Sequence, residues 1–548
     1  MDNHWENCYN FGKKRGDCMN KFLKVGLIGA ILFSLVLGTL KSTTFAASGK
    51  IFIGKEFYHG LVKFKQNGKY GMLDKKGKVI VNSQYQNIDQ SKRTNVIRVQ
   101  KNKKYGFINQ KGKVIVKPQY DFAELGNTDP IVVTKNKKYG FIHSGGKIIV
   151  KPKYQEIGKF QNGAAYFKSN GKYGIINTKG RIVLPPTYDK ITQNTDGVFT
   201  VRQDKKYGLI NKQGKVIVSP IYQSIGSFDN RLAKFKYEGK YGVISTEGTL
   251  ITEPKYDWIS TFYNGFAQTR LNNKFGFINT KGNLIAEPVY DMVYLYRNGL
   301  APVVKDGKLG FLDTTGKMKI QPQYEEAYDT DGSALFEFWQ NAAIIMKDGK
   351  YGIINKEGQV LLDFNYDLIN MYRGGLAIII QNNQYGVVNE KGRVVVEPSY
   401  KYLRPAVYLD GEFTGNFVIF KQNNKEGVIN SKGKVMVKEK YDRIDPFGYK
   451  GLIQVKQGSK YGVLSSNGKA LVKPKYREIG PFYKSNSYLA DVNYKGKYGF
   501  INDKGKEVIA PKYDQVGSFK EGVVYVRKNG KAGFVDQKGK VVLKLIYY

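Results

Sequence analysis

The sequence predicts an all-β protein: a tandem array of fourteen units, each with about three short antiparallel strands. One glycine recurs through the chain, and from Gly106 to Gly310 its spacing is 34 residues six times in succession. The composition, with 41 Tyr, 31 Phe and 62 Gly, is typical of strands and turns. We expect the units to stack into an open solenoid or superhelix. Paired β-propellers of seven blades each are the alternative, although three strands are few for blades that usually have four.

The recurring glycine defines the register of the repeat. Each copy has a second glycine six residues later and a tyrosine fourteen residues later. Because both offsets hold in every unit, they mark the same structural positions fourteen times. The glycines are Gly71, Gly106, Gly140, Gly174, Gly208, Gly242, Gly276, Gly310, Gly352, Gly386, Gly427, Gly462, Gly499 and Gly533.

Residues 104–120 (KYGFINQKGKVIVKPQY) show what each unit contains. Gly106 lies in a first short strand, and Asn109 with Gly112 is typical of a type I turn closed by a glycine bulge. The next strand is β-branched and contains Pro118, which cannot donate to a ladder and therefore belongs at a strand end or on an edge. The rest of the unit supplies a third strand and a hairpin turn of the Asn-Gly type.

The tyrosine at offset fourteen is predicted to plug the core between neighbouring units. Tyr120 is the example, and we expect its hydroxyl to be hydrogen-bonded locally. The same structural roles are assigned to Gly140, Gly146, Tyr154, Gly174, Gly180 and Tyr188 in the next units.

These residues resemble the WG repeat family, also called KWG repeats, which is found in many bacterial proteins. The family signature, aromatic-Gly-φ-φ-[ND]-x-x-Gly-K-x-φ-φ-x-P-x-[FY]-[DE], is matched repeatedly from about residue 50 to the end of the chain. The aromatic is Tyr in ten units and Phe275 in another, whereas Leu309, Glu426 and Ala532 replace it elsewhere. The resemblance implies a β-repeat fold and brings no catalytic residues.

Residues 1–47 form a leader that predicts export. An apolar run over residues 25–40 lies between lysines and precedes small residues, as in a secretory signal peptide. Its 16 residues are fewer than the roughly 20 that a spanning helix needs. We expect a signal peptide over about residues 19–47, with translation starting at Met19, and a secreted or cell-surface protein. An uncleaved membrane anchor is the alternative.

The charge of the chain predicts its partners. Lys and Arg number 88 against 46 Asp and Glu, a formal net charge of +42. Such a field attracts polyanions, although lysines that protect strand edges also raise the charge. We expect a protein or an anionic cell-wall or polysaccharide polymer as partner. Nucleic acid is the less favoured alternative because of export, and the membrane is expected to be contacted only through the N-terminal segment.

The repeat lengthens in the second half of the array. The glycine spacing reaches 42 residues after Gly310 and 41 after Gly386. We therefore divide the array into regular repeats at 48–324 and repeats with insertions and a C-terminal cap at 325–548. Insertions in solenoids often form the binding face, and a surface loop without a role is the alternative. The candidate binding residues are aromatic: Trp258, Phe336, Phe338, Trp339, Tyr408 and Phe413.

No motif predicts a catalytic, cofactor or metal site. Cys8 and Cys18 both lie in the leader, and His59 and His143 are the only histidines after it. The fragment at residues 329–332 lacks the ligand set of a calcium loop. The acids that follow the repeat tyrosine recur, which favours a structural role: Asp121, Asp189, Asp257, Asp291, Asp442 and Asp514.

Together these features predict an exported, non-enzymatic repeat scaffold that binds a protein or an anionic polymer at the cell surface. A nucleic-acid-binding repeat protein is one alternative, because lysines and aromatic residues interleave along the array. A cell-wall glycan hydrolase is the other, because paired carboxylates are the usual machinery of glycosidases and Asp and Glu are plentiful.

Overall fold

The structure of the protein is a computed structural model that describes residues 51–91, 95–125, 129–194, 197–370, 375–406, 417–447, 451–482 and 488–547. The chain from Ser48 to Tyr548 forms one compact unit. The predicted signal peptide and two of the candidate binding residues, Tyr408 and Phe413, lie outside the described residues.

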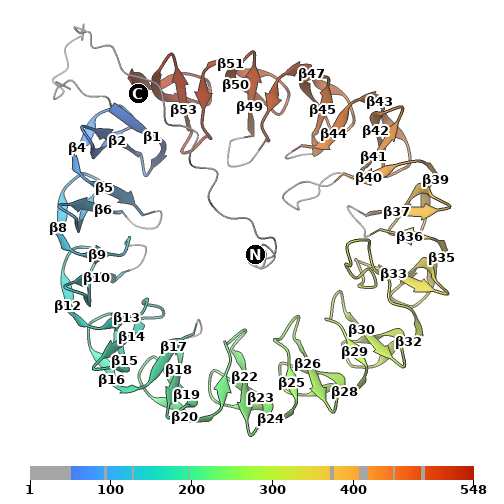
Figure 1. Cartoon of the computed structure of the whole chain (residues 1–548), viewed down its shortest axis with the longest axis horizontal. Helices are drawn as coiled ribbons and strands as arrows, with labels where there is room; N and C mark the ends of the chain where they lie inside the picture. Colours follow the sequence, from blue (N-terminus) through green and yellow to red (C-terminus); the bar gives the residue numbers. More distant parts are fainter. Residues whose placement is uncertain are drawn as a thin grey trace, which may run out of the picture. The chain divides into compact units, whose positions relative to one another are not determined.

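The described residues form fourteen antiparallel sheets that follow one another around a ring (Figure 1). We call each sheet a blade and number the blades in chain order. Thirteen blades have four strands and blade 9 has three, always paired in sequence order. The last strand of each blade lies at the outer rim, and the first faces the centre of the ring (Figure 1).

Blades 1–5 contain β1 (Ile51–Tyr58), β2 (Leu61–Gln66), β3 (Lys69–Asp74), β4 (Val79–Tyr85); β5 (Asn87–Gln90), β6 (Val96–Lys101), β7 (Lys104–Asn109), β8 (Val114–Tyr120); β9 (Phe122–Ala123), β10 (Ile131–Lys135), β11 (Lys138–Ile142), β12 (Ile148–Tyr154); β13 (Glu156–Ile157), β14 (Ala164–Ser169), β15 (Lys172–Asn177), β16 (Ile182–Tyr188); β17 (Lys190–Gln193), β18 (Val198–Gln203), β19 (Lys206–Asn211) and β20 (Val216–Tyr222). Blades 6–10 contain β21 (Ser224–Ile225), β22 (Leu232–Tyr237), β23 (Lys240–Ser245), β24 (Leu250–Tyr256); β25 (Trp258–Ile259), β26 (Phe266–Leu271), β27 (Lys274–Asn279), β28 (Leu284–Tyr290); β29 (Met292–Val293), β30 (Leu300–Lys305), β31 (Lys308–Asp313), β32 (Met318–Tyr324); β33 (Ala342–Lys347), β34 (Lys350–Asn355), β35 (Val360–Tyr366); β36 (Leu368–Ile369), β37 (Leu376–Gln381), β38 (Gln384–Asn389) and β39 (Val394–Tyr400). Blades 11–14 contain β40 (Leu403–Pro405), β41 (Phe417–Gln422), β42 (Lys425–Asn430), β43 (Val435–Tyr441); β44 (Arg443–Pro446), β45 (Ile453–Gln457), β46 (Lys460–Leu464), β47 (Ala470–Tyr476); β48 (Glu478–Ile479), β49 (Leu489–Tyr494), β50 (Lys497–Asn502), β51 (Glu507–Tyr513); β52 (Gln515–Val516), β53 (Val523–Lys528), β54 (Lys531–Asp536) and β55 (Val541–Tyr547).

The turn between the third and fourth strands has the predicted chemistry. In blade 2 the Gly112 amide donates to the Asn109 carbonyl at 2.9 Å, and the Asn109 side-chain oxygen accepts from the amides of Lys111 and Lys113. Gly112 has φ of 78°, and a Cβ there would lie 2.5 Å from the Ile80 carbonyl of blade 1. Glycine is therefore required both by the backbone conformation and by the packing of each turn on the preceding blade.

The first glycine of each repeat allows the third and fourth strands to approach closely. A Cβ at Gly106 would lie 2.5 Å from the Val116 carbonyl and 2.6 Å from the Pro118 nitrogen. Pro118 lies in β8, the outermost strand of blade 2, which confirms the prediction of an edge strand. The same clashes would occur at Gly140, and Gly174 is similarly enclosed, so these glycines have the structural role predicted for them.

The repeat tyrosines form the predicted plugs between blades. Tyr120 is 2% exposed and belongs to a core that joins Phe107 of blade 2 to Ala123 and Val133 of blade 3. Tyr154 and Tyr188 are equally enclosed in the following interfaces. Each blade thus buries its faces against its neighbours, as the stacking of repeats predicts.

The two ends of the array meet, and we call the interface between blade 14 and blade 1 the seam. Phe57 of β1 packs edge-to-face on Phe534 of β54, with ring centroids 4.7 Å apart, inside a core shared by both blades. Glu56 pairs with Lys520 at 2.7 Å and Lys75 with Glu521 at 3.3 Å. No strand is exchanged across the seam, because blade 1 is built from β1–β4 and blade 14 from β52–β55.

The structure confirms the all-β tandem array of fourteen units and corrects two details. The array is one closed ring rather than an open solenoid or a pair of seven-bladed propellers. Most blades also have a fourth strand, which can be as short as Phe122–Ala123 in β9. Strands of two residues are too short to produce an alternating pattern of apolar and polar residues, so the sequence predicted only three strands in each unit.

Candidate functional site

Two of the candidate binding aromatics are core residues. Phe336 is fully buried and Phe338 is 4% exposed, both in the core between blades 8 and 9. Phe338 packs edge-to-face on Phe311, with ring centroids 5.1 Å apart. The expectation that these two rings are free to bind a partner is therefore wrong: the insertion fills the interface of the blade that lacks a fourth strand.

The other described candidates are accessible but are not brought together. Trp339 is 50% exposed at the start of a turn that leads into β33. Trp258 is half-buried in β25 of blade 7 and stacks edge-to-face on Phe275. With one ring in blade 7 and the other in blade 9, these aromatics do not form a single site.

The recurring acids form hydrogen bonds that link neighbouring blades. The Asp189 side chain accepts the Asp204 amide at 3.0 Å and pairs with Lys172 at 2.5 Å. The hydrogen bond from Lys172 is the main reason that the pKa of Asp189 lies below its ordinary value. The same double contact recurs at Asp121, Asp257, Asp291, Asp367, Asp442 and Asp514. Each of these carboxylates holds a hairpin turn in place.

The histidines and Asp329 of the calcium-like fragment make hydrogen bonds within the protein: His59 Nε2 lies 3.1 Å from the Ser91 carbonyl oxygen, and Asp329 accepts from the Asn370 side-chain amide at 3.1 Å. His143 Nδ1 lies 2.9 Å from the Gly145 amide, and its ring pairs with Asp129. Asp329 accepts the Thr330 amide at 2.7 Å. Among the described residues, no group of three or more His, Cys, Asp or Glu is placed to hold a metal ion.

One face of the ring carries a row of cations. The residue after the second glycine of each repeat, which closes the turn between the third and fourth strands, is basic and exposed in eleven of fourteen blades. Because all blades share one strand order and register, these residues lie on the same face, which we call the turn face. These turn-face cations are Lys78, Lys113, Lys147, Arg181, Lys215, Lys317, Arg393, Lys434, Lys469, Lys506 and Lys540.

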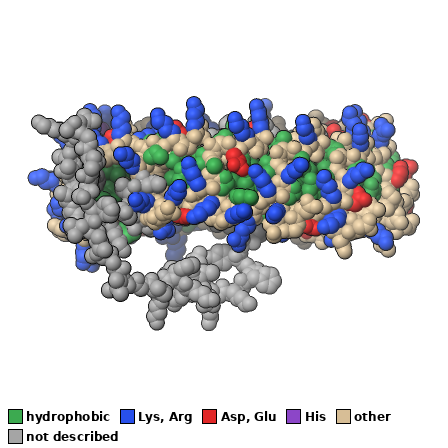
Figure 2. Space-filling model, turned by 90° about the horizontal axis from the view of Figure 1, so that it is seen from above, with side chains coloured by type: hydrophobic (Ala, Val, Ile, Leu, Met, Phe, Trp, Pro, Cys, Tyr) green, Lys and Arg blue, Asp and Glu red, His purple; other side chains and the backbone are tan. Residues whose placement is uncertain are grey.

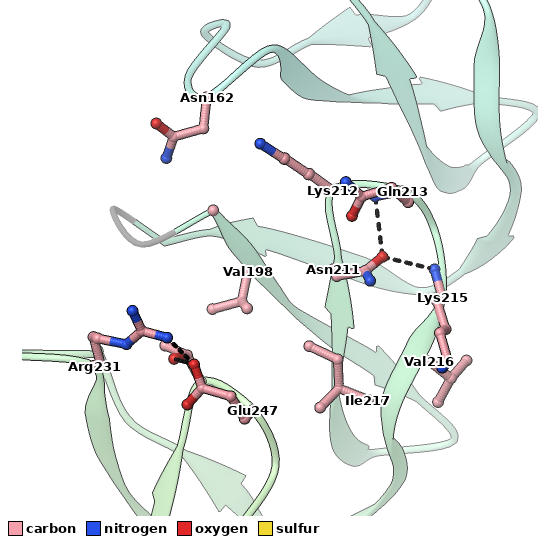
Figure 3. A pocket seen from close by; sticks show the side chains of 12 residues that line it. Asn162, Val198, Asn211, Lys212, Gln213, Lys215, Val216, Ile217, Arg231 and Glu247 are labelled. Carbon is pink, nitrogen blue, oxygen red and sulfur yellow. Dashed lines mark hydrogen bonds and ion pairs between the residues drawn. The ribbon is translucent and has the colours of Figure 1, made fainter.

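The turn face is hollowed across blades 4–6. Two adjoining pockets, of about 930 and 450 Å³, share Asn162, Lys212 and Gln213, and together we call them the basic groove. The first is lined by residues of three successive blades (Figure 3). Its floor is apolar, with Val198 and Ile217.

The charged side chains of the basic groove come from its turns. Arg181 and Lys215 are turn-face cations, and Lys212 extends from blade 5 toward Asn162 of blade 4 (Figure 3). Arg231 of blade 6 pairs with Glu247, the one carboxylate that lines the groove. Four cations therefore face one carboxylate, an arrangement that suits an anionic ligand.

Basic side chains also follow the outer rim. Figure 2 shows Lys and Arg along both borders of the rim, with hydrophobic side chains in a band between them. Elsewhere on the rim, Val114, Ile148, Ile182 and Val216 lie at the start of outer strands and are each at least 43% exposed. Lysines beside these edges fit the alternative reading of charge as edge protection.

The basic groove was not predicted from the sequence, although the position of some of its cations could have been. The cation that follows the turn glycine is regular enough to be read from the repeat. Arg231 and Lys212 lie at positions without a consistent charge, so their approach to those cations depends on how neighbouring blades pack.

Comparison with protein families identifies the repeats directly. The family described as "WG containing repeat" matches residues 70–105, 105–125, 139–173, 173–207, 207–241, 241–275, 275–308, 310–351, 351–385, 385–425, 427–461, 461–498 and 498–531. No curated protein matches the chain.

Similar solved structures include the extracellular domain of a hybrid two-component system of B. thetaiotaomicron, which is 10% identical in sequence. The match covers 86% of this chain and 79% of that chain, with a TM-score of 0.20. A eukaryotic initiation factor has 8% identity over 64% of this chain and 96% of that chain, with a TM-score of 0.24. PorZ of Porphyromonas gingivalis has 10% identity over 91% and 81%, with a TM-score of 0.19. These scores are too low to indicate a shared fold, so the family assignment rests on the repeats.

Proposed function

This chain belongs to the WG repeat family, and from that premise we propose that its ring is an exported, non-enzymatic scaffold that binds an anionic polymer at the cell surface. The observation that carries the proposal is the row of turn-face cations leading through the basic groove. A polymer with regularly spaced negative charges can contact many such cations at once, and their contributions add along its length.

The charge distribution supports an anionic partner over a neutral one. The net charge of +42 raises the local concentration of polyanions around the whole ring. Exposed cations of the turn face would displace the counterions that surround a polyanion, so its binding should weaken strongly as the salt concentration rises.

Export and the absence of catalysis are parts of the same proposal. The apolar run at residues 25–40 supports delivery to the cell surface, where anionic wall polymers and polysaccharides are available. Within the described residues, no helix has the length and apolar character needed to cross a membrane. A scaffold role is also supported by the recurring acids, whose hydrogen bonds to turns give each a structural purpose.

The test is salt-dependent binding of polyanions to the compact unit 48–548. Its affinity for polyglycerol phosphate and for polygalacturonate is measured from 50 to 300 mM NaCl by titration calorimetry. The double variant Lys212→Glu/Lys215→Glu removes two groove cations. The matched control, Lys117→Glu/Lys151→Glu, makes the same change of net charge at exposed lysines of the outer strands β8 and β12.

We expect the groove variant to lower the slope of log Kd against log salt by about two, about one for each lost contact, and the control to lower it by less than half as much. Equal effects of both variants would mean that only net charge matters and would contradict the proposed face. Equal affinity for single-stranded DNA of the same charge would indicate unspecific attraction and would also contradict the proposal.

A further inference from the structure

One junction of the ring departs from the repeat in two positions at once. At eleven junctions, the residue after the core tyrosine accepts a backbone amide from the hairpin turn of the next blade. Between blades 10 and 11 that residue is Lys401, whose ammonium can only donate. The equivalent acceptor in blade 3, Asp121, takes the Asn136 amide at 2.6 Å.

The second departure removes an aromatic ring from the same junction. Glu426 occupies the position before the strand glycine, where ten other blades have Tyr. In blade 7, the equivalent ring of Phe275 packs on Trp258 at 6.5 Å between centroids. In blade 11 the corresponding residues are Tyr402 and Glu426, so this pair of positions holds one aromatic ring instead of two.

Glu426 is held inside the wall of the blade and is not free to repel an anion. It is 8% exposed, accepts from Arg404 Nη2 at 3.1 Å and from the Ile444 amide at 2.6 Å. Arg404 also lies 3.7 Å from Asp445. The negative charge of Glu426 is therefore compensated by its ion pair with Arg404.

These two departures coincide with a pocket of about 950 Å³. We call it the Tyr402 pocket; its lining is Ser399, Tyr400, Lys401, Tyr402, Lys421, Gln422, Asn423, Asn424 and Glu426. Its lining residues lie at the end of β39 and in the turn that joins β41 to β42, at the junction of blades 10 and 11.

Two tyrosines, Tyr400 and Tyr402, are accessible at this junction. Eleven equivalents of Tyr400 are buried, including Tyr85, Tyr256 and Tyr441, whereas Tyr400 is only half-buried. Tyr402 is 42% exposed, and its ring centroid lies 6.4 Å from that of Tyr385. This junction thus exposes an aromatic side chain at Tyr402, as the equivalent position of blade 3 does at Phe122, which is 46% exposed.

The chemistry of the Tyr402 pocket matches that of an acidic sugar. A pyranose has an apolar face of C–H groups that packs on an aromatic ring, and its hydroxyls need amide partners. Gln422, Asn423 and Asn424 supply amides on one wall, while Lys401 and Lys421 supply two ammonium groups. Two lysines beside one mostly buried carboxylate, Glu426, favour a negative substituent on the sugar.

We propose that the Tyr402 pocket binds one acidic sugar unit, a pyranose that carries a carboxylate or a sulfate. The ring stacks on Tyr402, the anionic substituent lies between Lys401 and Lys421, and the amides of the hairpin turn bind the hydroxyls. The site lies in blades 10 and 11, apart from the basic groove of blades 4–6, so it does not depend on the function proposed for that groove.

The test uses short sugars that reach one pocket only. The compact unit 48–548 is titrated with tetragalacturonate, with a sulfated tetrasaccharide and with the neutral maltotetraose. We expect either or both of the acidic sugars to bind at least tenfold more tightly than maltotetraose, and their ratio identifies the preferred anionic group. Equal binding of all three, or binding of none at millimolar concentration, would overturn the proposal.

Substitutions then locate the site. Lys401→Asp restores the acceptor found at the other junctions and should weaken acidic-sugar binding at least tenfold without lowering Tm. Tyr402→Ala should weaken it by about tenfold through loss of the stacking surface. The matched control is Arg477→Asp, which makes the same change at a junction where Asn493 accepts the turn amide of Gly496 instead.

The outcomes separate the two sites. Arg477→Asp and the groove variant Lys212→Glu/Lys215→Glu should leave tetrasaccharide binding within twofold of the wild type. Wild-type affinity in Lys401→Asp and Tyr402→Ala would refute the Tyr402 pocket even if the groove binds polymers.

Discussion

Truncation of Phe57 tests whether the ring is held closed by side-chain packing at the seam. The side chain is fully buried, 4.7 Å from the ring of Phe534, and belongs to a core that joins blades 1 and 14. Phe57→Ala should cost about 3–5 kcal/mol, the usual range for a buried phenylalanine. The two seam ion pairs have partly exposed side chains and contribute about 0–1 kcal/mol each, so they cannot compensate.

The location of the damage follows from the connectivity. All other interfaces are also joined by the chain itself, whereas in the described part of the chain blades 1 and 14 meet through side-chain packing, ion pairs and two hydrogen bonds that involve the backbone. The Gly60 amide donates to the Glu521 carboxylate at 3.0 Å, and Lys75 Nζ donates to the Glu521 carbonyl at 3.0 Å. We therefore expect Phe57→Ala to open the seam first and to leave the central blades folded, as nearest-neighbour coupling in repeat proteins predicts.

Hydrogen exchange measured by mass spectrometry is the assay. Amides of β1–β2 and β53–β54 should lose protection by about 10²- to 10³-fold, which corresponds to about 3–4 kcal/mol at 1.4 kcal/mol per factor of ten. The matched control is Phe107→Ala, an equally buried ring between blades 2 and 3. Its effect should centre on those blades. Equal loss of protection in all blades, or no change in blade 14, would refute the reasoning.

Three further predictions concern the repeat itself. Hydrogen bonds from lysines hold the pKa values of the recurring aspartates below the ordinary value. The stability that these aspartates add is therefore present above their unfolded-state pKa and is lost as pH falls through their folded-state pKa. Tm should be level from pH 5 to 8 and fall below about pH 4, and a Tm that rises below pH 4 would contradict this. In urea unfolding, Gly106→Ala should destabilise the protein by about 1–3 kcal/mol, because the added Cβ would lie 2.5 Å from a backbone atom. Gly517→Ala should be nearly neutral, because the nearest atom to its added Cβ is 3.4 Å away. Equal losses of stability in the two variants would show that close strand approach is not the cause. The side-chain amide of Gln268 donates across the blade interface to the Val293 carbonyl at 2.8 Å. Gln268→Met should therefore lower the free energy of unfolding by about 1 kcal/mol in the same assay. An unchanged urea midpoint would show that this hydrogen bond adds no stability.

The repeat unit was predictable because its signals are local. The turn of Asn109 and Gly112, the edge position of Pro118 and the core role of Tyr120 each follow from the chemistry of a few neighbouring residues. Repetition then removed the ambiguity that a single copy would leave.

Ring closure was not predictable in the same way. Whether fourteen blades close or spiral depends on a small rotation between neighbours that accumulates around the array. No residue encodes that rotation alone. The seam residues Phe57 and Phe534 carry ordinary core side chains, so nothing in their sequence positions distinguishes contact with a distant blade from contact with a near one.

The prediction that Phe336 and Phe338 are binding residues was wrong for a different reason. Phe338 lies fourteen residues before its strand glycine, the same place as Phe160, Phe228 and Tyr296, all of which are buried. That offset was a usable signal for a core role, but the insertion obscured it. The departures at Lys401 and Glu426 were also visible in the sequence. Their significance for binding became apparent only from the pocket that both of them line.

The central claim, a single closed ring of fourteen blades with a turn face of cations, is tested most directly by electron-microscopy class averages of residues 48–548. We predict face-on averages that show one closed ring with fourteen evenly spaced blades. An open arc, or two smaller rings side by side, would contradict the account.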